Sequence, residues 1–161
     1  MMLLMFRVNG NRYGIDVVDV VEVVPCVPLQ KLQKSPPNVA GLLNYRGNVI
    51  PVVDSSLLLG GMDVKACLSS RIIMVRSDKM RSSCIGFLAE NVTETLKIDD
   101  HKFTDAGVGE EGSSLVDKVV LDGAGMIQHI DVTLLIPDEL KSFMKSFNSA
   151  DAEPVGLSNG S

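Results

Sequence analysis

The sequence predicts an all-β protein with a C-terminal α-helix, and three observations lead to this fold class. The chain has 161 residues, which fits one domain, or one domain made of two small halves. Its residues are 45% hydrophobic but only 4% aromatic, and Val, Ile and Leu supply most of the apolar fraction, which favours a sheet over a helix bundle. Short apolar runs alternate with turn sequences, the pattern of successive β-hairpins.

The first predicted hairpin surrounds Asn9-Gly10-Asn11, a turn sequence between two β-like runs. Three more hairpins follow the same pattern, over 39–54 with its tip at 46–48, over 72–89 and over 119–130. The run 17–24 fits either a short helix or a strand, because its periodicity does not decide between them.

Helical structure is expected in two places. Residues 55–59 form a predicted helical turn that Gly60 ends. Pro137 begins an amphipathic helix whose apolar residues fall at helical spacing: Leu140, Phe143, Met144 and Phe147. The acidic, Gly-rich region 99–114 is expected to be a long mobile loop, and the tail 149–161 to be disordered.

An internal duplication organises the chain. Tyr13-Gly14-Ile15 matches Ile85-Gly86-Phe87, and the stretch ending in Asp54 matches the one ending in Asp131. Each half contains a hairpin, a connector, a second hairpin, an Asp and a Leu-Leu pair. The duplication predicts two small five-stranded barrels. It places their halves roughly at 14–70 plus terminal elements and at 71–136, within one domain over 1–148.

Composition argues against several classes of partner. The net charge of -5 repels a phosphate backbone, so a small barrel that binds nucleic acid is the least favoured alternative. No apolar stretch approaches the ~18 residues of a membrane span, so we expect a cytoplasmic protein without direct membrane insertion. The three cysteines are far apart and form no Cys-x-x-Cys pair, so neither a disulfide framework nor a metal site is expected.

The residues give little support for catalysis. His101 lies in the acidic loop, and His129 is expected to face outward from a strand. The Gly-x-Gly-x-x-Gly at 107–112 contains two carboxylates that would repel phosphate, so it is interpreted as a flexible loop. Asp54 and Asp131 remain an alternative: a carboxylate pair for acid/base chemistry, or two caps of the turns that follow them.

The tip of the 39–54 hairpin indicates a contact surface. Tyr45 and Arg46 place a ring and a guanidinium on a turn, although Arg is not a turn-forming residue. Arg is enriched at binding hot spots because it offers a rigid fork of donors. We therefore expect partner contact at Tyr45, Arg46 and Asn48. Glu22 is either an edge charge that discourages strand pairing or half of a salt bridge to a partner.

These residues also carry a resemblance. Gly41-x-x-Asn44-x-Arg46-Gly47, followed by Pro51-x-x-Asp54, resembles the signature of the CheW family, the proteins that couple chemoreceptors to a histidine kinase. The similarity covers about residues 3–140. It implies two SH3-like barrels, no catalytic activity and no cofactor. Ser55-Ser56 and the acidic loop are more similar to couplers of accessory, Wsp-type systems.

The resemblance also implies the partners. They are the cytoplasmic tip of a methyl-accepting chemoreceptor and the regulatory, P5-like domain of the histidine kinase CheA. Such a protein is cytoplasmic and joins the membrane only through receptor arrays. The positions that match the receptor-binding region of the family are Val20, Glu22, Gly41, Asn44 and Arg46. Apolar barrel surfaces would meet the kinase domain.

Overall fold

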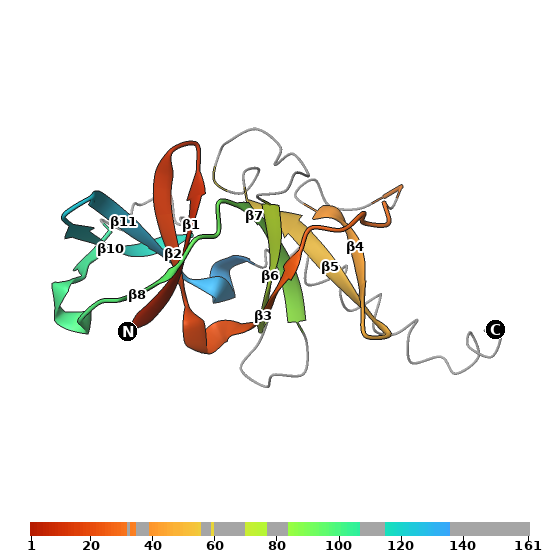
Figure 1. Ribbon diagram of the computed structural model, residues 1–161, viewed down its shortest axis with the longest axis horizontal. Helices are drawn as coiled ribbons and strands as arrows, with labels where there is room; N and C mark the ends of the chain where they lie inside the picture. Colours follow the sequence, from red (N-terminus) through yellow and green to blue (C-terminus); the bar gives the residue numbers. More distant parts are fainter. Residues whose placement is uncertain are drawn as a thin grey trace.

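The computed structural model describes residues 1–31, 33–34, 39–55, 59, 70–76, 84–106 and 115–135. The described strands form one sheet, drawn in Figure 1, which confirms the all-β prediction. In chain order the elements are β1 (Met2–Val8), β2 (Asn11–Asp16), η1 (Val17–Asp19), β3 (Val20–Pro25), β4 (Val39–Tyr45), β5 (Asn48–Asp54), β6 (Ser70–Arg76), β7 (Cys84–Glu90), β8 (Thr95–Lys97), η2 (Asp100–Lys102), β9 (Thr104–Asp105), β10 (Val116–Asp122), β11 (Gly125–Ile130) and η3 (Val132–Leu135). The predicted C-terminal helix, the disordered tail and the glycine motif at 107–112 lie outside the described residues.

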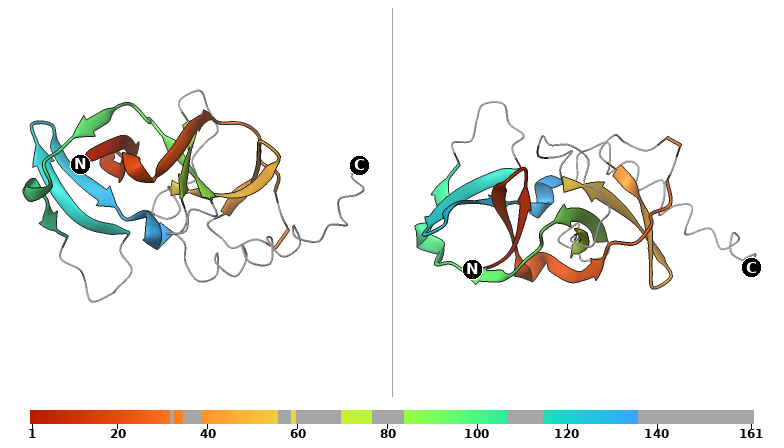
Figure 2. Two further views of the ribbon diagram at one scale, coloured as in Figure 1. Left: turned by 90° about the horizontal axis from the view of Figure 1, so that it is seen from below. Right: turned by 45° about the horizontal axis from the view of Figure 1, so that its top comes forward.

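The sheet divides into two groups of strands. One has the order β8-β1-β2-β11-β10-β9 and the other the order β3-β6-β7-β5-β4. They are joined where Arg7 of β1 pairs with Glu90 of β7. Figures 1 and 2 show the groups side by side along the long axis of the molecule. Among the described strands the end strands of neither group pair with each other, so the pairing does not close a barrel.

The predicted hairpins are confirmed as β1–β2, β4–β5, β6–β7 and β10–β11. Asn9 and Gly10 have φ angles of 52° and 82°, the two positive values that a type I′ turn requires. The ambiguous run 17–24 contains both alternatives in succession, the 3-10 helix η1 and then β3. The side chain of Asp16 starts η1 by accepting a hydrogen bond from the Val18 N–H at 3.2 Å.

Strands from the two copies of the duplication pair with each other. Gly14 of β2 pairs in parallel with His129 of β11, and Gly86 of β7 pairs in parallel with Val52 of β5. In each group, therefore, a strand from one copy of the duplication lies beside a strand from the other copy. The groups do not follow the sequence halves 14–70 and 71–136, because β6 and β7 pair with β3 and β5. A single domain over 1–148 stays a prediction.

One apolar cluster joins the two groups. Phe6 of β1 packs edge-on against Phe87 of β7, with ring centroids 5.4 Å apart, and stacks on Tyr13 of β2 at 5.7 Å. Each ring is at most 5% exposed. The remaining buried members come from both groups: Val8, Ile15, Val53, Ile73, Val75, Ile85, Ala89, Ile130 and Val132. Each group also has a smaller cluster of its own.

Two sequence-based expectations were wrong. His129 faces inward and is 7% exposed, because its ring packs edge-on against Phe103 and its Nδ1 lies 2.5 Å from Asp117 Oδ1. Part of the expected mobile loop 99–114 is regular: η2 covers Asp100–Lys102, and β9 pairs with β10. Loop composition did not predict this pairing, because β9 is only two residues long and depends on its neighbour.

A bidentate ion pair holds the end of the β10–β11 hairpin against β2. Arg12 Nη1 and Nη2 donate to the two Asp122 carboxylate oxygens at 2.7 and 2.9 Å. The hydrogen bonds from Arg12, supported by the Ala124 N–H, lower the pKa of Asp122 from its ordinary 3.8 to about 2.

The Asp122 pKa leads to a pH prediction. Because the folded pKa is depressed, the stabilisation by this carboxylate is complete above about pH 4 and is lost as the pH falls through about 2. An NMR titration of the Asp122 carboxyl carbon should find its midpoint near 2. Arg12→Met should raise this midpoint toward 3.8. Arg7→Met is the matched control: Arg7 lies opposite Arg12 on β1, and removing its positive charge should leave the Asp122 midpoint low. Equal midpoints in the two variants would contradict the assignment.

Candidate functional site

The candidate site begins at the tip of the β4–β5 hairpin. Tyr45 pairs with Asn48, which leaves Arg46 and Gly47 as a two-residue turn. Their φ angles of 53° and 85° define a type I′ turn. The Asn44 side chain stabilises it, because its Oδ1 accepts a hydrogen bond from the Gly47 N–H at 3.1 Å. Asn44 and Gly47 are therefore explained by the turn itself.

Arg46 is not explained by the turn. The first central position of a type I′ turn favours Asn, Asp or Gly, and a left-handed conformation costs another residue roughly 1–2 kcal/mol. Its side chain is 72% exposed, so little burial offsets this cost. The turn alone therefore gives no reason for an arginine at this position.

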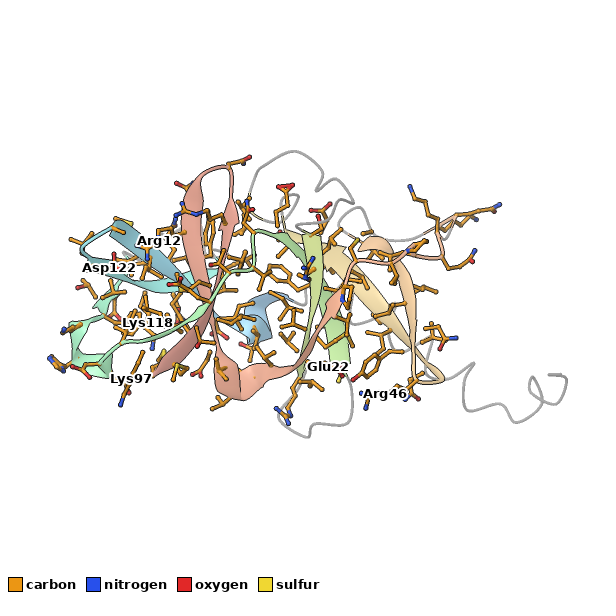
Figure 3. The ribbon with its side chains drawn as sticks, viewed as in Figure 1. Arg12, Glu22, Arg46, Lys97, Lys118 and Asp122 are labelled. Carbon is orange, nitrogen blue, oxygen red and sulfur yellow. The ribbon has the colours of Figure 1, made fainter. Side chains whose placement is uncertain are left out.

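Arg46 and Tyr45 converge on Glu22, as Figure 3 shows for Arg46 and Glu22. The Tyr45 hydroxyl donates to Glu22 Oε1, and Arg46 Nη2 donates to the same oxygen at 3.2 Å. The Arg46 guanidinium also lies 5.0 Å from the centre of the Tyr45 ring. The hydrogen bond to Glu22 raises the pKa of Tyr45. Since β3 and β4 are opposite ends of their group, these contacts bring its two ends together.

Two exposed valines lie near Glu22 in the chain. Val18 of η1 is 72% exposed and Val21 of β3 is 41% exposed, next to Glu22. Val20, which the resemblance assigns to the receptor-binding region, packs partly buried against the shared core, and its part in receptor binding stays a prediction. The sequence did not distinguish these valines, because the pairing of β3 with β6 shifts register between Val20 and Glu22. We call the cluster of Glu22, Tyr45 and Arg46, together with the exposed Val18 and Val21 of the adjoining segment, the hairpin-tip surface.

Gly41 lies away from the hairpin-tip surface. It is buried in β4, where the segment after β3 crosses it and Gln30 pairs with Leu42. A Cβ atom at Gly41 would lie 2.7 Å from Leu29 Cβ and 3.0 Å from Gln30 O. The close approach of this connector therefore requires glycine. Asn48, on the other side of the turn, is exposed.

The two matched carboxylates do not act alike. Asp131 Oδ1 accepts hydrogen bonds from the Thr133 N–H at 3.0 Å and the Thr133 hydroxyl at 2.7 Å, so Asp131 caps η3. Asp54 is a buried residue of β5 that pairs with Leu88, and it is 4% exposed. The geometry of Asp131 thus supports the capping interpretation over the acid/base one.

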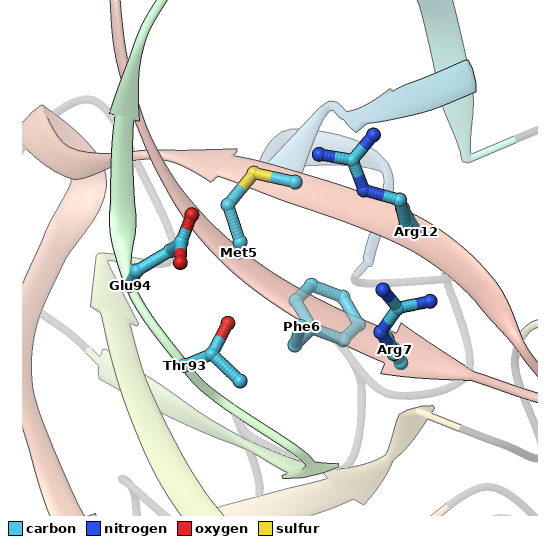
Figure 4. Close-up of a pocket in the computed structure, with 6 residues that line it drawn as sticks. All are labelled: Met5, Phe6, Arg7, Arg12, Thr93 and Glu94. Carbon is cyan, nitrogen blue, oxygen red and sulfur yellow. The ribbon is translucent and has the colours of Figure 1, made fainter. Parts of the chain in front are cut away.

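A small cavity lies beside β1, at the passage toward β8. It has a volume of about 200 Å³, and Figure 4 shows the residues that line it: Met5, Phe6, Arg7, Arg12, Thr93 and Glu94. This is below the ~300–1,000 Å³ that is usual for small-molecule sites. The Arg12 guanidinium is already held by Asp122, which raises its pKa. Across the described part of the chain no three metal-ligating side chains come together.

A family model described as the CheW-like domain matches residues 2–140. The chain belongs to the CheW-like family. Two relatives are each called chemotaxis protein CheW. The one from Rhizobium meliloti (strain 1021) is 29% identical over 98 residues, and the one from Bacillus subtilis (strain 168) is 22% identical over 139. The Rhizobium match covers 61% of either protein, so this chain spans about three fifths of that relative; the Bacillus match covers 85% of this chain and 87% of its relative.

A solved structure agrees with the family assignment. The crystal structure of the scaffolding protein TtCheW from Thermoanaerobacter tengcongensis is similar with a TM-score of 0.76 and 26% identity. The match covers 84% of this chain and 87% of TtCheW. The prediction that the chain is not an enzyme agrees with its family, in which the two relatives are named chemotaxis proteins and the solved neighbour a scaffolding protein. None of its helices among the described residues is long and apolar enough to span a membrane.

Proposed function

We propose that the chain couples methyl-accepting chemoreceptors to a histidine kinase, with the cytoplasmic receptor tip bound at the hairpin-tip surface. The observation that carries this proposal is Arg46, an arginine that is 72% exposed at a left-handed turn position where Asn, Asp or Gly is usual. Glu22 and Tyr45 hold its guanidinium in one place before any partner arrives. Such preorganisation lowers the entropy cost of binding.

The chemistry of the hairpin-tip surface suits a helical receptor tip. Val18 and Val21 offer apolar contact, and Arg46 offers a fork of donors that matches a carboxylate. Of the five positions that the resemblance assigned to the receptor, Glu22 and Arg46 would make contact directly. The other three would support receptor binding indirectly. Asn44 would stabilise the turn, Gly41 would allow the close approach of the connector, and Val20 would pack against the core.

The kinase partner is proposed from the resemblance. The regulatory, P5-like domain of the kinase would meet apolar surfaces of the two strand groups, and the two SH3-like barrels belong to this proposal. The C-terminal helix over 137–147 belongs to the same proposal. The protein would act in the cytoplasm and reach the membrane through receptor arrays. A Wsp-type system stays a prediction.

The test is binding of the purified full chain to a receptor cytoplasmic tip, and separately to a kinase regulatory domain from the same genome. Arg46→Glu should weaken receptor binding by about 30-fold or more, roughly 2 kcal/mol, which is the size of a hot-spot effect. Kinase binding should not change, because the proposed kinase surfaces do not include Arg46. Calorimetry of both pairs measures the two affinities.

Arg46→Asn serves as the matched control for folding. Asn suits the left-handed turn, so this variant should be as stable as the wild type or more stable, while it still loses receptor affinity. If Arg46→Asn binds the receptor as tightly as the wild type does, Arg46 is not part of the receptor-binding site. If the wild type binds neither partner, the proposed coupling function is wrong.

A further inference from the structure

The opposite end of the molecule carries a groove between two strand edges. It has a volume of about 420 Å³ and lies between β8 and the outer end of β10. Leu96, Lys97 and Ile98 line one side, and Val120 and Leu121 line the other. Both sides are edges of the sheet as far as the described strands show: among them β8 pairs with β1 alone, and β9 covers β10 only at Lys118 and Val119.

The edge of β8 offers backbone hydrogen-bonding groups to a ligand. Met1 and Ile98 exchange both backbone bonds, at 2.9 and 2.8 Å. In an antiparallel ladder the next residue directs its N–H and C=O to the other side. Lys97 therefore presents its backbone donor and acceptor at the open edge, on the side of the groove. An extended peptide that adds a strand to a sheet uses groups of this kind.

Apolar anchors flank the groove. Leu121 and Met126 face each other across the β10–β11 hairpin and are 71% and 51% exposed. The ion pair between Arg12 and Asp122 fixes this hairpin end against β2, so the anchors are held in place without a ligand. Large apolar side chains at a rigid, concave edge are typical of peptide-binding sites.

The charge at the groove has the sign opposite to that of the whole chain, which is -5. Lys97 and Lys102 line the groove and are exposed. Lys118 lies close by, with its ammonium 5.0 Å from the centre of the Phe103 ring, and Figure 3 shows Lys97, Lys118 and Asp122 at this end. Asp122 is neutralised by Arg12, which leaves Asp99 as the other acid lining the groove. When Arg12 is counted with its partner Asp122, the two lysines and Asp99 leave one net positive charge at the groove, and the nearby Lys118 lies opposite Asp105.

We propose that this groove binds an extended, acidic segment of a partner protein. The segment lies along the edge of β8 as an added strand. Its carboxylates pair with Lys97 and Lys102, and one apolar side chain rests on Leu121. This surface is separate from the hairpin-tip surface, so the chain would hold a further partner without displacing the one bound at Arg46.

The test uses the full chain and a capped peptide of alternating glutamate and leucine as the probe. We expect saturable binding that weakens with added salt, because exposed charges carry part of it. NMR shift changes should be confined to β8, η2 and the β10–β11 hairpin. The variant Lys97→Glu/Lys102→Glu should bind roughly tenfold more weakly. The matched variant Lys31→Glu/Lys34→Glu, with the same charge change at two exposed residues after β3, should bind like the wild type.

Three results would overturn the proposal. One is equal binding of a control peptide of alternating lysine and leucine. Another is equal affinity of the Lys97→Glu/Lys102→Glu variant and the wild type. The third is a concentration-dependent dimer, seen by sedimentation, that Leu121→Ser abolishes, since the groove edge would then serve a second copy of this chain. Leu121→Ser changes an exposed side chain, so loss of peptide binding in this variant without a dimer supports the proposed anchor.

Discussion

Phe6→Ala should lower the free energy of unfolding by about 3–5 kcal/mol, the usual cost of removing a buried phenylalanine. Phe6 is 1% exposed and contacts both Tyr13 in its own group and Phe87 in the other. Removing it leaves a cavity at the junction, where Arg7 and Glu90 form the pairing between β1 and β7. Since the free energy of unfolding of a native protein is only about 5–15 kcal/mol, this substitution should remove a large part of the stability.

Urea unfolding measures this effect, and the chain carries its own probes. It has no Trp and two Tyr, with Tyr13 in one strand group and Tyr45 in the other. With Phe6 in place, the Tyr13→Phe variant reports unfolding through Tyr45, and the Tyr45→Phe variant reports it through Tyr13. Each should show a single transition, with similar urea midpoints, because one core spans both groups. Leu121→Ala, at a 71% exposed position, is the control and should shift stability by less than about 0.5 kcal/mol. A Phe6→Ala effect no larger than this control would mean that the junction is not a packed core.

Gly41→Ala should lower the stability by about 1–3 kcal/mol, although it adds only one methyl group. The new Cβ would lie 2.7 Å from Leu29 Cβ and 3.0 Å from Gln30 O, and neither atom is the end of a flexible side chain. The connector must therefore move away from β4, which also breaks the pairing of Gln30 with Leu42. Receptor affinity should fall as a consequence of this displacement.

The matched control for Gly41→Ala is Gly123→Ala. Gly123 lies in the β10–β11 turn, and a Cβ atom there would have no neighbour within 4 Å. Chemical denaturation measures the stability of both variants, and a binding assay measures their affinity for the receptor. Together they distinguish a packing role of Gly41 from a direct contact with the receptor. If Gly41→Ala keeps wild-type stability but loses receptor binding, Gly41 contacts the receptor directly and the packing interpretation fails.

The hairpins and the duplicated segments could be predicted from sequence because their signals are local. Asn9-Gly10 and Arg46-Gly47 mark two-residue turns, and alternating apolar runs mark the strands beside them. The exchange of partners between copies could not be predicted in this way. The pairing of Gly14 with His129 joins residues far apart in the chain, and no local pattern specifies such a partner.

The candidate site was predicted unevenly for the same reason. The sequence placed Tyr45 and Arg46 on one turn, but their contact with Glu22 depends on how the ends of a five-strand group approach each other. Val18 and Val21 were missed because an apolar residue in a strand is expected to be buried unless its register is known. The inward orientation of His129 depends on Phe103 and Asp117, which lie on other elements.

The parallel pairing of β2 with β11 also affects the order in which the strands can pair while the chain is being synthesised. A ribosome releases β1 and β2 first, yet the neighbour of β2 is made last among the described strands, and Arg12 meets Asp122 only after 110 more residues. The β2 edge of the first hairpin must therefore stay open until β11 has been made, while β3 to β7 can already complete their own group. Long-range pairing of this kind folds slowly and leaves strand edges exposed to other chains. The nascent protein is thus most at risk of aggregation through the edge of β2 that β11 later covers.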